Sequence, residues 1–329
     1  MGKKRKDGES TLTVVLALIA NAGVGVLKLG AGLVSGSSAL LSEAAHSASD
    51  CTTEVLLLVA QHRSRKPADR THPFGYGKER YFWSMLAAIA IFVSGAGFSF
   101  YEGLSTLLGG GVSKMLWINY PVLALAAVLE GISLRQAARQ MRHETATERR
   151  SVLSYLRTPR DPTVNSVLLE DSAALIGLAL AAVGVGLHML TGSAVWDASA
   201  SLAIGALLLN VSFVLARACE KLIVGTQADP RLIEDVVKFL EANDEVLDVV
   251  DILTMRTGSD SVLLCARVDF EEPFSASDLE ALCVRLDDEL RSKFKPLDEV
   301  FIQPASRDDD RLRRRVEHRY GHAMADEAP

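Results

Sequence analysis

Residues 40–50 read LLSEAAHSASD and place ionisable side chains inside a segment that is otherwise apolar enough to enter a lipid bilayer. Ser42, His46, Asp50 and Glu54 follow one another at intervals of four residues. A step of four residues advances a helix by about 400°, so these side chains form one slowly drifting stripe on a single face. An imidazole and a carboxylate at positions i and i+4 provide half of a site for a divalent cation, and zinc suits mixed nitrogen and oxygen ligands.

A second apolar segment, which begins DPTVNSVLLEDSAALIG, carries the adjacent acids Glu170 and Asp171. An ionisable side chain at the bilayer centre costs about 2.5–3.5 kcal/mol on insertion scales, so it normally faces a partner or a water-filled cavity. His46, Asp50 and Asp171 together offer three metal ligands, and a weak or water-filled fourth position suits a metal that must leave again. The alternative is a buried His46–Asp50 pair that only fixes helix packing.

The composition indicates a membrane protein with a soluble part. Of the 329 residues, 49% are hydrophobic and 23% are charged, and the mean hydropathy is +0.19. A high apolar content and an ordinary charged content agree if the two are concentrated in different parts of the chain. A membrane-spanning helix takes about 20 mostly apolar residues. Six segments qualify, namely 11–34, 38–60, 83–107, 116–137, 165–189 and 194–219.

The basic residues predict how these segments are oriented. Lys and Arg concentrate in alternate connections, and the opposite connections contain Lys114 and no Arg. The positive-inside rule therefore predicts a multi-pass protein with both termini in the cytoplasm. The basic start, MGKKRKDGES, is followed by no small-residue cleavage site, so we interpret the first apolar segment as a membrane helix. The four cysteines form no CxxC pair, which argues against a disulfide framework or a thiolate zinc site.

After about residue 220 the pattern changes to that of a soluble domain. Amphipathic helices and two strands joined by TGSD predict the order αββαβ, and SASD predicts a capping box at the start of the second helix. The predicted fold is a polytopic α-helical membrane protein with six transmembrane helices and a C-terminal cytoplasmic α+β domain. Its predicted parts are a basic N-terminus (1–10), a six-helix transmembrane domain (11–222), the α+β domain (226–306) and a charged tail (307–329) that is partly helical or disordered.

The motifs SGSSALLSEAAHSASD and THPFGYGKERY, the acidic fifth helix, the six spans and the αββαβ domain resemble the cation diffusion facilitator family over about residues 10–306. The run LLEDSAALIG, preceded by DPTVN, is most similar to the zinc transporter nine branch. The resemblance implies a homodimer that exchanges zinc or a related ion for protons. It also implies a ferredoxin-like cytoplasmic domain and a tetrahedral metal site made by His/Asp-x-x-x-Asp motifs on the second and fifth helices.

Two features depart from the family pattern. His46 and Asp50 fill the motif on the second helix, but on the fifth helix Asp171 fills only the second position, and the first is Val167. Glu170, about 100° from Asp171 around the helix, is the candidate replacement, with Asn165 a weaker one. Residues 226–306 contain no histidine, although family members with cytoplasmic zinc sites carry histidines there. We therefore expect that domain to serve dimerisation only.

These observations predict a metal/proton antiporter, not an enzyme, with the ligands His46, Asp50, Asp171 and Glu170. Zinc is the expected cargo, and the same ligands suit Mn²⁺, Co²⁺ or Fe²⁺. The expected partners are a second copy, the lipid bilayer, the cation and protons, with no resident cofactor and no nucleic acid. Two alternatives stay open: a non-transporting membrane metal sensor or scaffold, suggested by Val167, and an intramembrane hydrolase that uses Asp50 and Asp171 as an acid–base pair.

Overall fold

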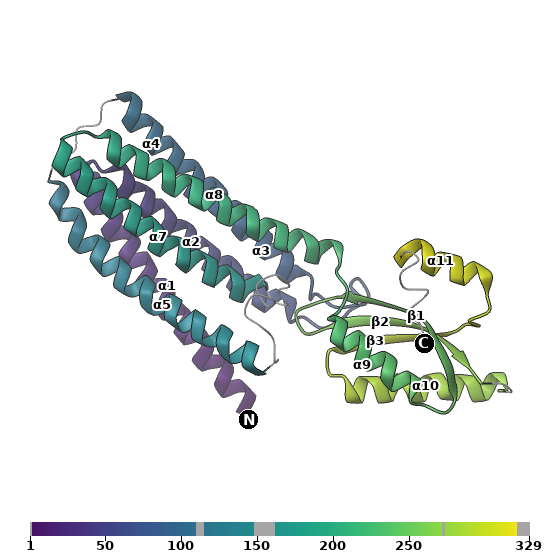
Figure 1. Ribbon diagram of the computed structural model, residues 1–329. Helices are drawn as coiled ribbons and strands as arrows, with labels where there is room; N and C mark the ends of the chain where they lie inside the picture. Colours follow the sequence, from purple (N-terminus) through teal and green to yellow (C-terminus); the bar gives the residue numbers. More distant parts are fainter. Residues whose placement is uncertain (1, 110–114, 148–161, 272–273, 321–329) are drawn as a thin grey trace. The chain divides into compact units, whose positions relative to one another are not determined.

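The computed structural model describes residues 2–109, 115–147, 162–271 and 274–320 (Figure 1). Residues 148–161 of the predicted Arg-rich connection and 321–329 of the predicted tail lie outside this range. The chain divides into two compact units. A helical unit comprises Met1–Arg63 and Glu79–Ile223, and an α+β unit comprises Ser64–Lys78 and Val224–Pro329.

The helical unit is a bundle of long helices that run side by side (Figure 1). The third rod of the bundle is continuous but contains one π-helical turn, η1 (Ile91–Gly97), between α3 (Glu79–Ala90) and α4 (Phe98–Gly109). A short 3₁₀ turn, η2 (Leu116–Ile118), leads into the next helix. The other helices are α1 (Gly2–Ser35), α2 (Ser38–Ser64), α5 (Asn119–Thr147), α7 (Pro162–Thr191) and α8 (Val195–Val224).

Four of the described helical segments are long and apolar enough to cross a membrane: Glu79–Gly109, Leu116–Arg139, Val167–Thr191 and Val195–Val224. Helices α1 and α2 are not among these four. For α1, most side chains of the first half are not among those that the structure describes. For α2, the polar stripe lowers the hydropathy of the helix. The helical unit is thus a multi-helix membrane domain, and its candidate metal ligands lie on α2, which carries a polar stripe, and on the strongly apolar α7.

Helices α1 and α2 form a tight antiparallel hairpin. Gly36 ends α1 with a positive φ of 67°, and its amide donates to the carbonyl of Gly32 at 2.8 Å. A glycine in this position is the usual way to stop a helix, since a side chain there would be strained. Small residues let the two helices approach closely: a Cβ added at Gly25 would lie 3.3 Å from Ser47 Cβ.

The α+β unit contains a three-stranded sheet in the described residues. Strands β1 (Val246–Arg256) and β2 (Val262–Phe270) are antiparallel, and β3 (Leu297–Pro304) pairs with β2 in parallel. Along β2 every second residue is buried, as the period of two requires. Helices α9 (Pro230–Glu241) and α10 (Ala276–Lys293) contribute leucines and valines to the same core. The predicted αββαβ order is therefore confirmed.

Local capping explains where α9 and α10 begin. Ser275 Oγ accepts from the amide of Asp278 at 3.2 Å, and the amide of Ser275 donates to Asp278 Oδ2 at 3.3 Å, which is the predicted capping box. Asp229 caps α9 by accepting from the amide of Arg231 at 3.1 Å, and Pro230 occupies the first helical position.

For residues 307–329 the sequence leaves a partly helical and a disordered tail open, and the described part of this segment contains a helix. Asp310–Tyr320 forms helix α11, Leu312 on this helix is buried, and Arg319 Nη1 donates to Asp251 Oδ2 at 3.0 Å. The charged composition of this segment does not decide between helix and disorder, because the ion-pair partner of Arg319 lies 68 residues away in the sequence. The tertiary contact supplies the order that the composition alone does not.

The connection Ser64–Lys78 belongs to the α+β unit, although it joins two helices of the other unit. A Cβ added at Gly77 would overlap the carbonyl oxygen of Thr257, and Lys78 Nζ lies 3.7 Å from Met255 Sδ. The backbone of Gly77 therefore packs directly against the β1–β2 turn. This association was not predicted from the sequence.

Candidate metal centre

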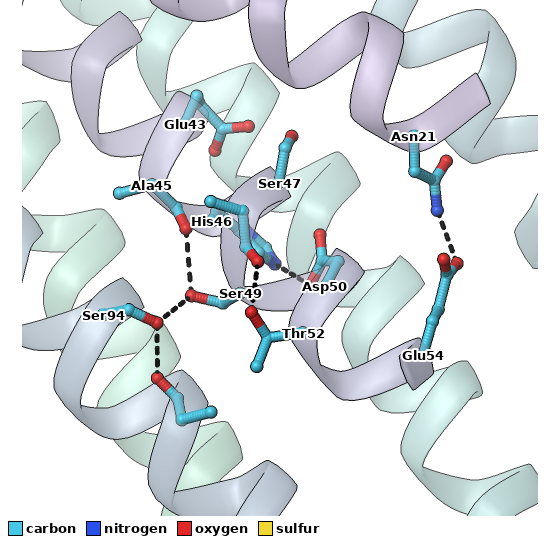
Figure 2. Close-up of polar contacts among 12 residues, drawn as sticks. Asn21, Glu43, Ala45, His46, Ser47, Ser49, Asp50, Thr52, Glu54 and Ser94 are labelled. Atoms are coloured by element: carbon cyan, nitrogen blue, oxygen red, sulfur yellow. Dashed lines mark hydrogen bonds and ion pairs between the residues drawn. The ribbon is translucent and has the colours of Figure 1, made fainter. Parts of the chain in front are cut away.

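Helix α2 brings together the first two predicted ligands. His46 Nε2 lies 3.4 Å from Asp50 Oδ1, and only 2% of the His46 side chain and 14% of the Asp50 side chain are exposed. Figure 2 shows the imidazole directed along the helix toward Asp50. The other ring nitrogen, Nδ1, has no hydrogen-bond partner among the described residues. The pair is the half-site that the i, i+4 spacing predicts.

The two outer members of the stripe contact different helices. Ser42 Oγ lies 2.5 Å from Ser201 Oγ of α8. Glu54 Oε1 accepts from Asn21 Nδ2 of α1 at 2.7 Å (Figure 2), while Glu54 Oε2 has no hydrogen-bond partner in the described chain. The stripe thus faces the interior of the bundle along its length. Only its middle part, His46 and Asp50, pairs within α2.

The acids of α7 occupy two different environments. Asp171 Oδ2 accepts from Ser133 Oγ of α5 at 2.7 Å. Glu170 is 8% exposed, and its Oε1 has no hydrogen-bond partner in the part of the chain that the structure describes. Val167, at the first position of the family motif, is half-buried. Asp171 is therefore positioned by a neighbouring helix, whereas Glu170 is buried with one oxygen unused.

The α2 and α7 residues do not form one coordination sphere in this conformation. Within the described residues, no group of three or more His, Cys, Asp or Glu side chains lies close enough to hold a metal ion. Asp50 is nevertheless within electrostatic range of four other carboxylates, those of Glu54, Glu130, Glu170 and Asp171. Repulsion among buried carboxylates favours the uptake of protons or a cation at this place.

A feature that sequence reasoning missed lies beside the half-site. Ser94, in the π-helical turn η1, places its Oγ 2.8 Å from Ser49 Oγ, next to Asp50 (Figure 2). A Cβ added at Gly95 would lie 3.1 Å from the same oxygen. Turns of π-helix inside α-helices occur frequently at functional sites. The spacing of residues in IFVSGAG gives no indication of a π-helical turn. The polar residues of α2, in contrast, are recognisable in the sequence because they interrupt an apolar segment.

Ser133 is a second residue that sequence reasoning missed. It follows Glu130 by three residues on α5 and therefore lies on the same face. Its hydroxyl orients the carboxylate of Asp171. A serine in an apolar helix is common, and so only the intramembrane Glu130 gave any signal that this face of α5 points inward.

Comparison with known proteins places the chain among metal transporters. A family model described as "Cation efflux transmembrane domain" matches residues 14–223. The chain is 34% identical over 259 residues to the proton-coupled zinc antiporter SLC30A9, mitochondrial, of Xenopus laevis, which covers 78% of this chain and 46% of that protein. It is 32% identical over 265 residues to metal tolerance protein C4 of Arabidopsis thaliana, covering 80% of this chain and 58% of that protein.

A bacterial relative matches over a longer part of its own length. The chain is 24% identical over 301 residues to the manganese efflux system protein MneP of Bacillus subtilis, covering 89% of this chain and 95% of that protein. In contrast, the chain spans about half the length of the SLC30A9 proteins that it matches. Members of the matched family are transporters, which removes the hydrolase alternative. The chain belongs to the cation efflux, or cation diffusion facilitator, family and to its branch similar to zinc transporter nine.

Proposed function

We propose that the protein is a metal/proton antiporter that carries a divalent cation, zinc in the first place. The observation that carries this proposal is the buried His46–Asp50 pair, which lies within electrostatic range of the acids on α7. Relatives named as a proton-coupled zinc antiporter and a manganese efflux protein support the choice of cargo. Mixed imidazole and carboxylate ligands are compatible with both ions.

In the proposed site, His46, Asp50 and Asp171 bind the metal together with Glu170. Glu170 takes the place of the ligand that Val167 does not supply. A buried carboxylate with an unused oxygen is costly unless something neutralises it, and a cation does so. The four side chains are not assembled in the described conformation, so metal binding in the proposed site includes a rearrangement of side chains or helices that brings the ligands of α2 and α7 together. Binding is thereby linked to this rearrangement.

Competition for the same atoms then couples the two fluxes. Metal ligands must be deprotonated, so an arriving cation releases protons from His46 and the carboxylates. Movement of the helices exposes the loaded site to the other side of the membrane, where protons replace the metal. No separate proton site is needed in this scheme.

The proposed topology has six membrane spans, with both termini on the cytoplasmic side. It rests on the alternation of connections rich in Lys and Arg with connections poor in them. It also rests on the six long helical segments described in the helical unit. We further propose that the α+β unit is a ferredoxin-like dimerisation domain. Residues 226–306 contain no histidine, so metal binding is not assigned to it.

A metal sensor or scaffold is the second candidate. The observation in its favour is Val167, which removes one ligand of the family motif from α7. A sensor would bind the cation and undergo the same helix movement without releasing the cation on the other side. Measured flux across a membrane therefore separates the two candidates.

The test is uptake of Zn²⁺, Mn²⁺, Co²⁺ and Fe²⁺ into proteoliposomes that contain the full chain, with and without an imposed pH gradient. Antiport predicts metal accumulation that requires the gradient and an equivalent movement of protons. His188→Ala provides a matched control, because His188 is also a buried histidine of the bundle, 7% exposed, and is not among the proposed ligands. Saturable metal binding without any flux in wild type would leave the sensor as the function.

A further inference from the structure

A buried ion pair joins α1 to α2 close to the candidate metal centre. Lys28 Nζ lies 3.0 Å from Glu43 Oε2 and 2.9 Å from Ser47 Oγ. The side chains of Lys28 and Glu43 are 1% and 0% exposed. Neither the candidate ligand set nor the proposed exchange of metal for protons uses this pair.

The second oxygen of Glu43 connects the pair to α7. Glu43 Oε1 has no hydrogen-bond partner among the described residues, and a Cβ added at Gly177 of α7 would overlap it. The absence of a side chain at Gly177 is therefore what makes room for this carboxylate. Glu43 lies between α1 and α7, the second of which carries Asp171 and Glu170.

The pair also has a defined place along α2. Glu43 precedes His46 by three residues and Asp50 by seven, which corresponds to about 4.5 Å and about 10 Å along the helix axis. Toward the α1–α2 turn nearly every residue of α2 is buried, whereas toward the other end Asp50 and Glu54 are half-buried and Thr52 is exposed. The metal ligands are thus closed off at the α1–α2 turn, with the ion pair as the nearest charged group on that side.

The charge of Lys28 bears on a cation in the metal centre. Its ammonium group lies within electrostatic range of His46 and of Glu130, and Glu43 lies within range of His46. A fixed positive charge in a low-dielectric interior repels a divalent cation that moves from His46 toward the α1–α2 turn. At the same time Lys28 binds the carboxylate of Glu43, which is the carboxylate of α2 nearest to His46 on that side.

A purely structural role explains the pair less well. A buried ion pair stabilises a fold weakly, and apolar side chains of similar volume are often as good or better. Small residues already bring α1 and α2 together at Gly25 and Gly32. Packing of the hairpin therefore does not require two opposite charges in the membrane interior.

We propose that Lys28 and Glu43 form a gate in which the lysine acts as a tethered cation. While Lys28 binds Glu43, the route from His46 and Asp50 to the α1–α2 turn is closed. The gate opens when the ammonium group leaves the carboxylate, which then offers a transient contact to the departing metal. The inference rests on the proposed transport function, because it assigns to the pair the control of that transport.

The test compares the full chain with the double variant Lys28→Met/Glu43→Met in proteoliposomes. Passive zinc flux without a pH gradient and zinc accumulation with a gradient are measured, together with zinc affinity and thermal unfolding in detergent. We expect wild-type affinity and folding, a rise in passive flux of at least about tenfold, and loss of gradient-driven accumulation. The matched control Ser42→Ala/Ser201→Ala removes an uncharged interhelical contact beside Glu43 and should keep the wild-type ratio of driven to passive flux.

A second variant covers the case in which the double variant is not recovered in folded form. Gly177→Ala keeps both charges but forces the Glu43 carboxylate away from α7, and we expect it to raise passive flux as well. A wild-type flux ratio in the variant that is recovered would overturn the gate. If wild type itself accumulates no metal under a pH gradient, the proposed transport function fails instead, so the two failures are distinguishable.

Discussion

A buried carboxylate of the α+β unit and the buried groups of the candidate metal centre differ in how far their hydrogen bonds are satisfied. In the α+β unit the carboxylate of Asp251 accepts hydrogen bonds from Arg267 at 2.6 Å and from Arg319 at 3.0 Å. In the helical unit His46 and Glu170 are comparably buried, yet each keeps one polar atom without a hydrogen-bond partner among the described residues. A buried polar atom left unsatisfied costs free energy, so it is expected where a ligand arrives and departs.

The same contrast separates structure from transport. Satisfied charges hold the sheet and α11 in one arrangement. The helical unit instead contains carboxylates that repel one another and an imidazole that lacks a partner on one side, and these groups are best satisfied when a cation binds. If the unsatisfied groups serve transport and the satisfied groups serve stability, substitutions of the former should lower metal flux and substitutions of the latter should lower the free energy of unfolding.

The largest expected effect is the loss of transport on removing the half-site. His46→Ala and Asp50→Ala should each lower gradient-driven zinc flux by more than about 100-fold, which exceeds the 10–100-fold cost of losing an outer-shell partner. The ion pair of buried His46 with half-buried Asp50 lies within α2, so expression and folding should stay near wild type. The measurement is initial zinc uptake per folded transporter. Flux at the wild-type rate in either variant would place the metal centre elsewhere.

The second effect concerns the missing ligand on α7. Glu170→Gln should impair transport of both Zn²⁺ and Mn²⁺ about tenfold or more, as expected for a metal ligand. Val167→His should tighten zinc binding, because it adds the imidazole that the family motif places four residues before Asp171. Glu102→Gln, a half-buried acid on α4, is the control. Wild-type flux of both metals in Glu170→Gln would leave Asp171 as the single ligand of α7.

Local patterns account for the parts of the fold that the sequence predicted. The capping box at Ser275 and the alternation along β2 depend on neighbours within a few residues, and both are found. The docked connection at Gly77 was missed, and the contact that orders α11 was not predicted, because their partners, Thr257 and Asp251, are remote in the chain. Composition describes such segments as loop and tail, and only tertiary contacts order them.

The candidate site also has one contact that a local pattern predicts and one that it does not. The pairing of His46 with Asp50 is an i, i+4 contact, and the helical period alone predicts it. The contact between Ser133 and Asp171 crosses 38 residues and two helices, so no local rule predicts it. Helical spacing likewise says nothing of how far the acids of α7 lie from His46 and Asp50, because that distance depends on the packing of separate helices. The sequence therefore predicts candidate ligands on each helix but not their assembly into one site.

A smaller effect is expected where a side chain positions a ligand without binding the metal. Ser133→Ala should weaken zinc affinity by about 10–100-fold, the range for outer-shell partners, because the Asp171 carboxylate loses its donor. Zinc affinity by calorimetry is the measurement. Ser172→Ala is the matched control, since among the described residues the hydroxyl of Ser172 bonds to the carbonyl of Leu168 at 2.6 Å and to no candidate ligand. Equal affinities in the two variants would show that the hydrogen bond to Asp171 is dispensable.

Removing a satisfied buried charge of the α+β unit should change the stability of that unit without changing metal flux. Asp251→Ala leaves Arg267 and Arg319 without their shared carboxylate and should lower the stability of the α+β unit by about 2 kcal/mol. Hydrogen exchange of α11 should rise, while zinc flux per folded transporter stays near wild type. Asp287→Ala removes a more exposed partner and should cost less, because Arg291 keeps its contact with Glu299 at 2.9 Å. A flux defect in Asp251→Ala would break the separation between the units.

The smallest expected effect lies in the exposed connection Ser64–Lys78. Hydrogen bonds from the Tyr76 hydroxyl and from the amides of His72 and Thr71 hold the pKa of Asp69 below its usual value of 3.8. A lowered carboxyl pKa means that the charged form stabilises the turn at neutral pH, and that this contribution disappears as the pH falls through the lowered pKa. Asp69→Asn should therefore speed hydrogen exchange of the Thr71 and His72 amides a few-fold at pH 7. Well below the lowered pKa, wild type and variant should exchange alike, because both side chains are then neutral. A difference that persists at low pH would show that side-chain shape, not charge, holds the turn.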